Sequence, residues 1–491
     1  SQLQRYSWVS LIVLFWLLWT VRPLGRWLFK VSVLIPHLAG VPTDLMLNGY
    51  SLLLDRSLVL LLSALLTAIA LYWLVRSCRQ PYELLEIPGF FLLLMKQYHP
   101  ALACLDRVVQ HCPDNYEAWY NRGNVLHELR CYEEAIESYD RAIALKPNYY
   151  DPTFNQGTHQ VWGNRGNSLE KLQQFEAAVA SHAKSAALQP DHPLPWYNQA
   201  VVFSNWGKCE EAIAANEKAI QLNPNYYQAW YNKGVMLQKL GRSQEALNAF
   251  DTVLRIKPGF ASAWLNRGVI LTQFQQLDEA MKSFKRADRL AGGGHLTWYN
   301  RGNVLMQTGQ LEDAMTAYEQ ALRLNPQYDP AWVNKGLVLR KLNQPEAAIA
   351  AYQEAIRLNP QSQLAWNNWI VLLFQQHQYA EALAVSDQSM QALPDNPAIL
   401  TVRGTVLSHL EQFDAAITSY EHAIALQPDF ASAWYDKACC LIMQDKQQEA
   451  IALLETAFRL NPSLKQHATT DSSLDPVRPN PQFQQLLASG N

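Results

Sequence analysis

Asparagine side chains recur along this 491-residue chain at a nearly constant interval. An asparagine amide offers one acceptor and two donors, so it can pair with both backbone groups of an extended peptide, whatever that peptide's side chains. Such a row therefore predicts a ladder of hydrogen bonds for a bound polypeptide. Its members are Asn121, Asn164, Asn198, Asn232, Asn266, Asn300, Asn334 and Asn368, and Asn124, Asn167 and Asn303 each follow a member by three residues.

The same asparagines have a second interpretation. They could tie neighbouring helices together inside the protein and bind nothing from outside. The sequence leaves both interpretations open.

Cations form a second row, in most cases one residue after an asparagine. They could present positive charge to an acidic partner. The favoured interpretation is that their stems cover apolar surface and their charged groups meet acids on nearby helices, such as Asp140 or Glu137. The row consists of Arg122, Arg165, Lys233, Arg267, Arg301, Lys335, Arg403 and Lys437.

Catalytic motifs are missing from the sequence. The 12 histidines form no H-E-x-x-H pattern, and the AGGGH segment lacks the lysine and hydroxyl of a phosphate loop. We therefore predict no enzyme activity, no cofactor, no metal site and no small-molecule substrate. The net charge is −3, and the basic residues of segment 1–81 leave the rest of the chain acidic, which argues against a nucleic-acid partner.

A 34-residue repeat positions the asparagines. We number its positions so that a recurring tryptophan is position 4 and a closing proline is position 32; the asparagine row is then position 6 and the cations position 7. Position 8 is small, position 20 is alanine and position 24 is usually aromatic. Positions 4, 8 and 11 form one stripe on a first helix, and 20, 24 and 27 form one on a second helix. The small residues let the two helices approach, and the proline ends the second helix.

This pattern resembles the tetratricopeptide repeat, a 34-residue helix–turn–helix unit. The resemblance implies an all-α superhelical solenoid of about eleven units over residues 82–462, with a concave groove lined mainly by first helices. The sequence motifs of the units (WYNRGN, YEEAI, SYDRAIALKP) are similar to those of bacterial, especially cyanobacterial, members of the family. The asparagine row looks like the ladder in the tetratricopeptide arm of the O-linked N-acetylglucosamine transferase. The carboxylate clamp of chaperone-binding members has no matching residue set here.

Three segments depart from the repeat. Residues 152–161 enlarge one loop between units, as a partner contact or as neutral surface. The AGGG segment at 291–294 replaces a stiff Asn-Pro turn, which predicts a hinge. Residues 463–491 are expected to cap the array, with Phe483, Leu486 and Leu487 on an amphipathic helix over Pro481–Ala488.

Residues 1–81 are predicted to anchor the chain in a membrane. Ser57–Val75 contains no charged residue for 19 residues, which suffices to cross a hydrocarbon core of about 30 Å. Segment 7–21, or slightly more, is interpreted as a first span, with an interfacial helix or a signal peptide as alternatives. Basic residues are nearly balanced between the connector and the outer flanks, so the orientation stays open.

The 7 cysteines are odd in number and form no C-x-x-C pair, which favours free thiols in a reducing compartment. We therefore expect an integral protein of a plasma or thylakoid membrane with a cytoplasmic body. By likeness to the family, it is a scaffold or assembly factor that binds a protein or peptide partner in its groove, for a complex such as a photosynthetic one. The alternative is an exported structural subunit of a polysaccharide or protein secretion machine.

Overall fold

The computed structural model describes residues 92–488, apart from residue 94 and residues 152–155. Both predicted membrane spans lie outside this part of the chain. Among the described residues, none of the helices combines the length and the apolar character that a membrane crossing needs. The chain divides into two compact units, residues 1–147 and 148–491.

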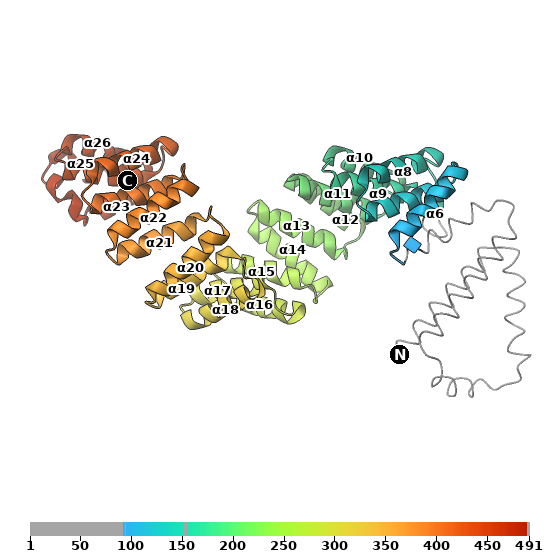
Figure 1. The fold of residues 1–491 in the computed structure, drawn as a ribbon, viewed down its shortest axis with the longest axis horizontal. Coiled ribbons are helices and arrows are strands. Elements are labelled where there is room, and N and C mark those ends of the chain that lie inside the picture. Colours follow the sequence, from blue (N-terminus) through green and yellow to red (C-terminus); the bar gives the residue numbers. More distant parts are fainter. Residues whose placement is uncertain (1–91, 94, 152–155, 489–491) are drawn as a thin grey trace, which may run out of the picture. The chain divides into compact units, whose positions relative to one another are not determined.

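The helices of each unit follow one another as hairpins (Figure 1). The described part of the first unit contains α6 (Tyr98–His111), α7 (Tyr116–Glu128) and α8 (Tyr132–Leu145). In the second unit, the first helices of the hairpins are α9 (Thr158–Lys171), α11 (Pro193–Trp206), α13 (Tyr227–Lys239), α15 (Ala261–Gln273), α17 (His295–Gln307), α19 (Asp329–Lys341), α21 (Gln363–Gln375), α23 (Pro397–His409) and α25 (Ala431–Met443). Their second helices are α10 (Phe175–Leu188), α12 (Cys209–Leu222), α14 (Ser243–Ile256), α16 (Leu277–Ala291), α18 (Leu311–Leu324), α20 (Pro345–Leu358), α22 (Tyr379–Ala392), α24 (Phe413–Leu426) and α26 (Gln447–Leu460).

Within a hairpin, the position-8 glycine lies directly under the position-24 ring. A Cβ added at Gly268 would stand 2.5 Å from the ring of Phe284, and one at Gly234 would stand 2.7 Å from that of Phe250. Both rings are fully buried. The glycine therefore makes room for a ring from the partner helix.

Sizes at these two positions compensate one another. Where position 8 is Ala200, position 24 is the smaller Asn216, and where position 8 is the bulky Ile370, position 24 is Ser386. All four of these residues are buried. Because the interior is close-packed, each hairpin fixes the sum of the two volumes rather than either one.

The turn inside every described hairpin uses one left-handed residue, always at position 15. Gly207, Gly241 and Gly309 occupy it at φ 73–82°. The other hairpins place a residue with a side chain there, at φ 58–64°: Lys96, Arg130, Gln173, Gln275, Asn343, His377, Glu411 and Asp445. This conformation closes the first helix and reverses the chain.

The turn between hairpins is held by a tryptophan and an asparagine. The Trp264 indole N–H donates to the carbonyl of Pro258, six residues earlier, at 2.9 Å, and Trp332 bonds Pro326 in the same way at 3.0 Å. Asn325 Oδ1 accepts from the backbone N–H of Gln327 at 3.2 Å. The position-4 tryptophan therefore fixes the turn as well as filling space.

Two of the irregular segments have structure of their own. Strand β1 (Tyr150–Asp151) pairs antiparallel with β2 (Gln156–Gly157), which lies within the predicted insertion 152–161. The insertion is a loop only as far as Gly157, because α9 begins at Thr158. At the AGGG segment, Gly292 and Gly293 adopt φ of 70° and 79°. The glycines thus follow a backbone path that the proline turns do not use, and whether this segment bends remains a prediction.

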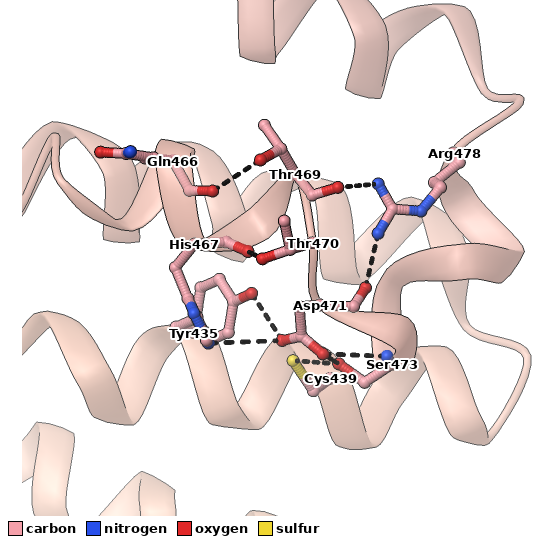
Figure 2. A network of polar contacts seen from close by, with 9 residues as sticks. All are labelled: Tyr435, Cys439, Gln466, His467, Thr469, Thr470, Asp471, Ser473 and Arg478. Carbon is pink, nitrogen blue, oxygen red and sulfur yellow. Dashed lines mark hydrogen bonds and ion pairs between the residues drawn. The ribbon is translucent and has the colours of Figure 1, made fainter.

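The last hairpin is covered by α27 (Leu464–Ala468), a 3-10 helix η2 (Ser472–Val477) and α28 (Pro481–Ala488). Phe483 is fully buried, and Leu486 and Leu487 pack on the same apolar cluster. Polar contacts reinforce this cover (Figure 2): Tyr435 donates to Asp471 Oδ2 at 2.7 Å, and Arg478 donates to the backbone carbonyl of Asp471 at 2.8 Å.

Candidate functional site

The position-6 asparagines all lie on first helices. Asn121 is buried on α7, and the other members of the row are half-buried. Each amide therefore keeps limited access to solvent, and the bonds that it makes inside the protein decide what it can offer to a partner.

Some of these amides bond the preceding repeat. The Asn266 amide donates to the hydroxyl of Tyr231 at 3.2 Å. The Asn334 amide donates both to the hydroxyl of Tyr299 at 3.2 Å and to Asn303 Oδ1 at 2.8 Å. These two asparagines tie neighbouring hairpins together.

Two further members make other internal bonds. Asn232 Oδ1 accepts from the hydroxyl of Ser204 at 3.2 Å, again from the preceding repeat. The Asn300 amide donates at 2.9 Å to the carbonyl of Leu296 on its own helix. The helix-tying interpretation therefore describes part of the row.

The position-9 asparagines face their own second helix. Asn124 Oδ1 accepts from the hydroxyl of Tyr139 at 2.9 Å, and Asn303 Oδ1 accepts from that of Tyr318 at 2.8 Å. Burial raises the pKa of both tyrosines, so the hydroxyls stay protonated donors. Asn167 occupies the equivalent position on α9, where position 24 is His182.

Asn198 and Asn368 are the half-buried members of the row whose amides make no hydrogen bond to any described residue. Asn164 has an interaction of its own. Asn198 and Asn368 are thus the best candidates for contact with a bound backbone, and the ladder as a whole stays a prediction.

Most of the position-7 cations are bound internally. Arg267 Nε donates to Asp251 of the preceding second helix at 2.7 Å, and its Nη1 donates to Ser283 Oγ of its own hairpin at 2.8 Å. The arginines of α7 and α23 repeat both bonds, to Asp106 and Ser138 and to Asp387 and Ser419. The lysines pair with Glu217, Glu319 and Glu421 at 2.7–3.1 Å.

The position-4 tryptophans stack against the same cations. Arg267 lies 5.8 Å from the Trp264 ring centroid, and Lys335 lies 5.4 Å from that of Trp332. The cation row therefore bridges an acid, a serine and an indole between hairpins. The acid belongs to position 25 of the preceding repeat, which is the position of the predicted Asp140 and not that of Glu137.

The position-5 tyrosines also contact the next hairpin. Tyr231 meets the ring of Phe260 edge-on at 5.0 Å, and Tyr299 meets Tyr328 at 5.2 Å. Part of this aromatic surface is therefore used between repeats.

Family models described as "Tetratricopeptide repeat" match residues 116–149, 159–192, 195–226, 215–248, 237–295, 299–362 and 333–397. Together with the hairpins seen in the structure, these matches settle the family. The chain belongs to the tetratricopeptide repeat family. Residues 375–457 of this tetratricopeptide array also match the model for the anaphase-promoting complex, cyclosome, subunit 3, and residues 98–129 match the protein prenyltransferase alpha subunit repeat.

Solved structures resemble parts of the tetratricopeptide array. Yeast Tom70 is 16% identical, with 83% of this chain and 98% of that chain covered at a TM-score of 0.45. YrrB, described as a tetratricopeptide protein with an unusual peptide-binding site, is 22% identical, with 38% and 96% covered at 0.34. MamA is 20% identical, with 35% and 94% covered at 0.32. None of the curated proteins compared with the chain matches it.

The chain is thus an all-α tetratricopeptide solenoid over its described residues, apart from the short β1–β2 pair. Proteins of this fold generally act as scaffolds for protein–protein interaction and bind a peptide or protein partner.

Proposed function

We propose that this protein is a membrane-anchored scaffold that holds an extended polypeptide along the first helices of its repeats. The observation that carries the proposal is the row of position-6 asparagines, in which Asn198 and Asn368 leave their amides unbonded in the described structure. An amide without an internal hydrogen bond suits a peptide backbone.

Uncharged segment 57–75 supports the membrane part of the proposal. A span there would hold the array beside the bilayer, where it could recruit a client protein to a membrane complex. The resemblance of the repeat sequences to cyanobacterial ones favours a client in a thylakoid or plasma membrane, with the array in the cytoplasm.

The test separates binding asparagines from helix-tying ones. One variant carries Asn198→Ala and Asn368→Ala, and its matched control carries Asn266→Ala and Asn334→Ala. A photo-crosslinking amino acid at Gln363, exposed on the first turn of α21, reports the bound client in native membranes.

We expect the first variant to lose the crosslinked client at an unchanged melting temperature. The control should lower the melting temperature, because each change removes a bond between hairpins, of about 1 kcal/mol. A first variant that crosslinks the client as well as the parent does would overturn the ladder.

A further inference from the structure

The position-7 cations follow a pairing rule in the described repeats. Six of them are paired at 2.7–3.1 Å with an acid at position 25 of the preceding repeat. Where position 25 holds no acid, as at Ala183 and Gln353, position 7 holds no cation, as at Gln199 and Trp369. At these junctions a cation and an acid therefore occur together or not at all.

Arg301 on α17 breaks the rule. Position 25 of the preceding repeat is Lys285, so a second cation stands where the acid belongs. Every other arginine of the row also has a serine at position 23 of its own hairpin, whereas Arg301 has Ala317. Both regular acceptors of the guanidinium are missing.

The bonds of Arg301 reflect this loss. Its buried Nε has no hydrogen-bond partner among the described residues, whereas the Nε of Arg267 donates to Asp251 at 2.7 Å. Its Nη1 reaches only Asp288, at 3.4 Å. Lys285 forms no ion pair with a described residue. Arg301 and Lys285 thus line the same place, and the only ion pair that either makes with a described residue is the long one between Arg301 and Asp288.

The glycine turn before α17 is also unlike the turns of the other repeats, and it contacts the same residues. Gly293 lies against this acid: a Cβ there would stand 2.7 Å from Asp288 Oδ1 and 3.1 Å from the Trp298 indole nitrogen. The Arg301 guanidinium is 4.1 Å from the Trp298 ring, nearer than the 5.4–5.8 Å of the other first-helix pairs. The guanidinium has therefore moved onto the indole.

A groove opens at this place, with a volume of about 560 Å³, between α16, α17 and α18. Lys285 and Arg301 line it, and so do the apolar side chains of Leu277, Met281 and Leu305. Asp278 and Asp313, in the first turns of α16 and α18, also line it. Helices α16 and α18 both run antiparallel to α17, so their first turns lie beside the end of α17. The two acids therefore lie at the Thr308 end of the groove and the two cations at the Trp298 end.

We propose that this groove binds a short acidic peptide segment of a partner protein, whose carboxylate takes the place of the missing position-25 acid. The array itself identifies the ligand chemistry, because six equivalent cations each hold an aspartate or glutamate. The guanidinium of Arg301 and the ammonium of Lys285 receive the carboxylate. An adjacent aliphatic side chain covers Leu277, Met281 and Leu305, and a basic residue beyond it meets Asp278 and Asp313.

This site is separate from the asparagine row. Its residues on α17 and at the C-cap of α17 stand at positions 4, 7, 10, 11 and 14, which share one helix face, whereas the asparagines stand at positions 6 and 9. The tetratricopeptide carboxylate clamp also uses positions other than 7 and 25. The groove therefore extends the proposed scaffold by a second contact that does not depend on the first.

The test titrates the full-length protein in detergent with fluorescent N-acetyl-Glu-Leu-Leu-Lys-amide, whose Gln-Leu-Leu-Lys counterpart is the matched control probe. The repaired variant Lys285→Glu, Ala317→Ser restores both regular partners of Arg301. The control variant is Lys282→Glu on the same helix, since Lys282 is exposed and does not line the groove.

We expect the glutamate peptide to bind about tenfold more tightly than the glutamine peptide. The repaired variant should lose this preference and melt at a higher temperature, and the control variant should keep the preference. The Asn198→Ala, Asn368→Ala variant should also keep it, so this result is independent of the proposed ladder. Equal binding of the two peptides, unchanged binding by the repaired variant, or displacement of the peptide by inorganic phosphate at equal concentration would each overturn the proposal.

Discussion

At the scale of single residues, a buried histidine replaces the usual ring of position 24. His182 is fully buried over Gly166, and neither of its ring nitrogens has a hydrogen-bond partner among the described residues. Burial lowers its pKa from 6.5 to about 4. The hydrophobic environment therefore holds the imidazole neutral.

This pKa makes the stability of the α9–α10 hairpin depend on pH. Below pH 6.5 the unfolded chain binds a proton at His182, which the native state does not bind until about pH 4. The free energy of unfolding therefore falls as the pH drops through this window, by roughly 3 kcal/mol in total.

We predict that His182→Phe removes this loss, because phenylalanine fills position 24 elsewhere. Thermal unfolding at pH 8 and pH 5 checks it: the advantage of the variant over the parent should grow at pH 5. The exposed His422→Gln serves as control. An advantage of the same size at both pH values would contradict the assignment.

At the scale of elements, the hairpin turn carries a cost in most repeats. A residue with a Cβ pays about 1 kcal/mol in the left-handed region, and glycine does not. Gln275, at φ 59°, holds position 15, where the preceding hairpin has Gly241.

We predict that Gln275→Gly stabilises the protein by about 0.5–1 kcal/mol, since the relief of strain exceeds the added freedom of the unfolded chain. The urea midpoint measures the change. Glycine at the adjacent Gln276, which has a φ of −88°, should lower the midpoint. If both changes act alike, strain at position 15 is not the cause.

Where the cap meets the last hairpin, Asp436 of α25 and Asp471 beside η2 have pKa shifts in opposite directions. Burial, and secondarily the charge of Asp471, raises the pKa of Asp436 to about 7. Burial would also raise the pKa of Asp471, but hydrogen bonds from Tyr435 and Ser473 lower it overall. Asp471 thus carries the charge that holds the cap (Figure 2).

Asp436 therefore opposes folding as the pH rises. Between pH 3.8 and about 7 the native state keeps a proton that the unfolded state loses, so the free energy of unfolding falls through this window. We predict that Asp436→Asn stabilises the last hairpin by roughly 2–4 kcal/mol at pH 8 and has little effect at pH 4.

Amide hydrogen exchange on α25 at the two pH values checks this prediction. The control is the exposed Asp429→Asn, which should not change exchange at either pH. A gain at pH 4 as large as the gain at pH 8 would show that packing, rather than ionisation, is responsible.

At the scale of the whole molecule, we predict that the first 81 residues fix the protein in a membrane. The uncharged segment 57–75 is long enough to do so without the shorter segment 7–21. Alkaline carbonate extraction should leave the full chain, and a chain lacking residues 7–21, in the membrane pellet. A chain lacking residues 1–81 should appear in the supernatant. Extraction of the full chain would contradict the anchor.

Much of the repeat could be predicted from the sequence because the 34-residue period brings back, in most copies, a glycine with a ring, such as Gly268 with Phe284, and a tryptophan with a proline, such as Trp264 with Pro258. Contacts between neighbouring hairpins were harder to predict, because helical periodicity tells which face a residue lies on but not which residue of the next helix it meets. Of the two acids that the sequence suggested for the cations, Asp140 stands at position 25, the position that pairs with the cation of the next repeat, as in the Arg267–Asp251 pair, whereas Glu137 stands at position 22. Asn334 bonds Tyr299 through the same register. One signal in the sequence could have revealed the pairing of positions 7 and 25: Gln199 and Trp369 replace the cation in the two repeats that follow an uncharged residue at position 25.

The two kinds of pairing described above differ in what they connect, and this difference constrains how such a gene can grow or shrink. Steric pairing of positions 8 and 24 stays within one hairpin, so it survives the gain or loss of any whole 34-residue cassette. Charge pairing of positions 7 and 25 joins two neighbouring repeats, so each gain or loss of a repeat brings a new pair of residues together at these positions. Loss of the cassette 261–294 would place Asp251 before Arg301 and close the acidic-peptide groove in a single genetic step.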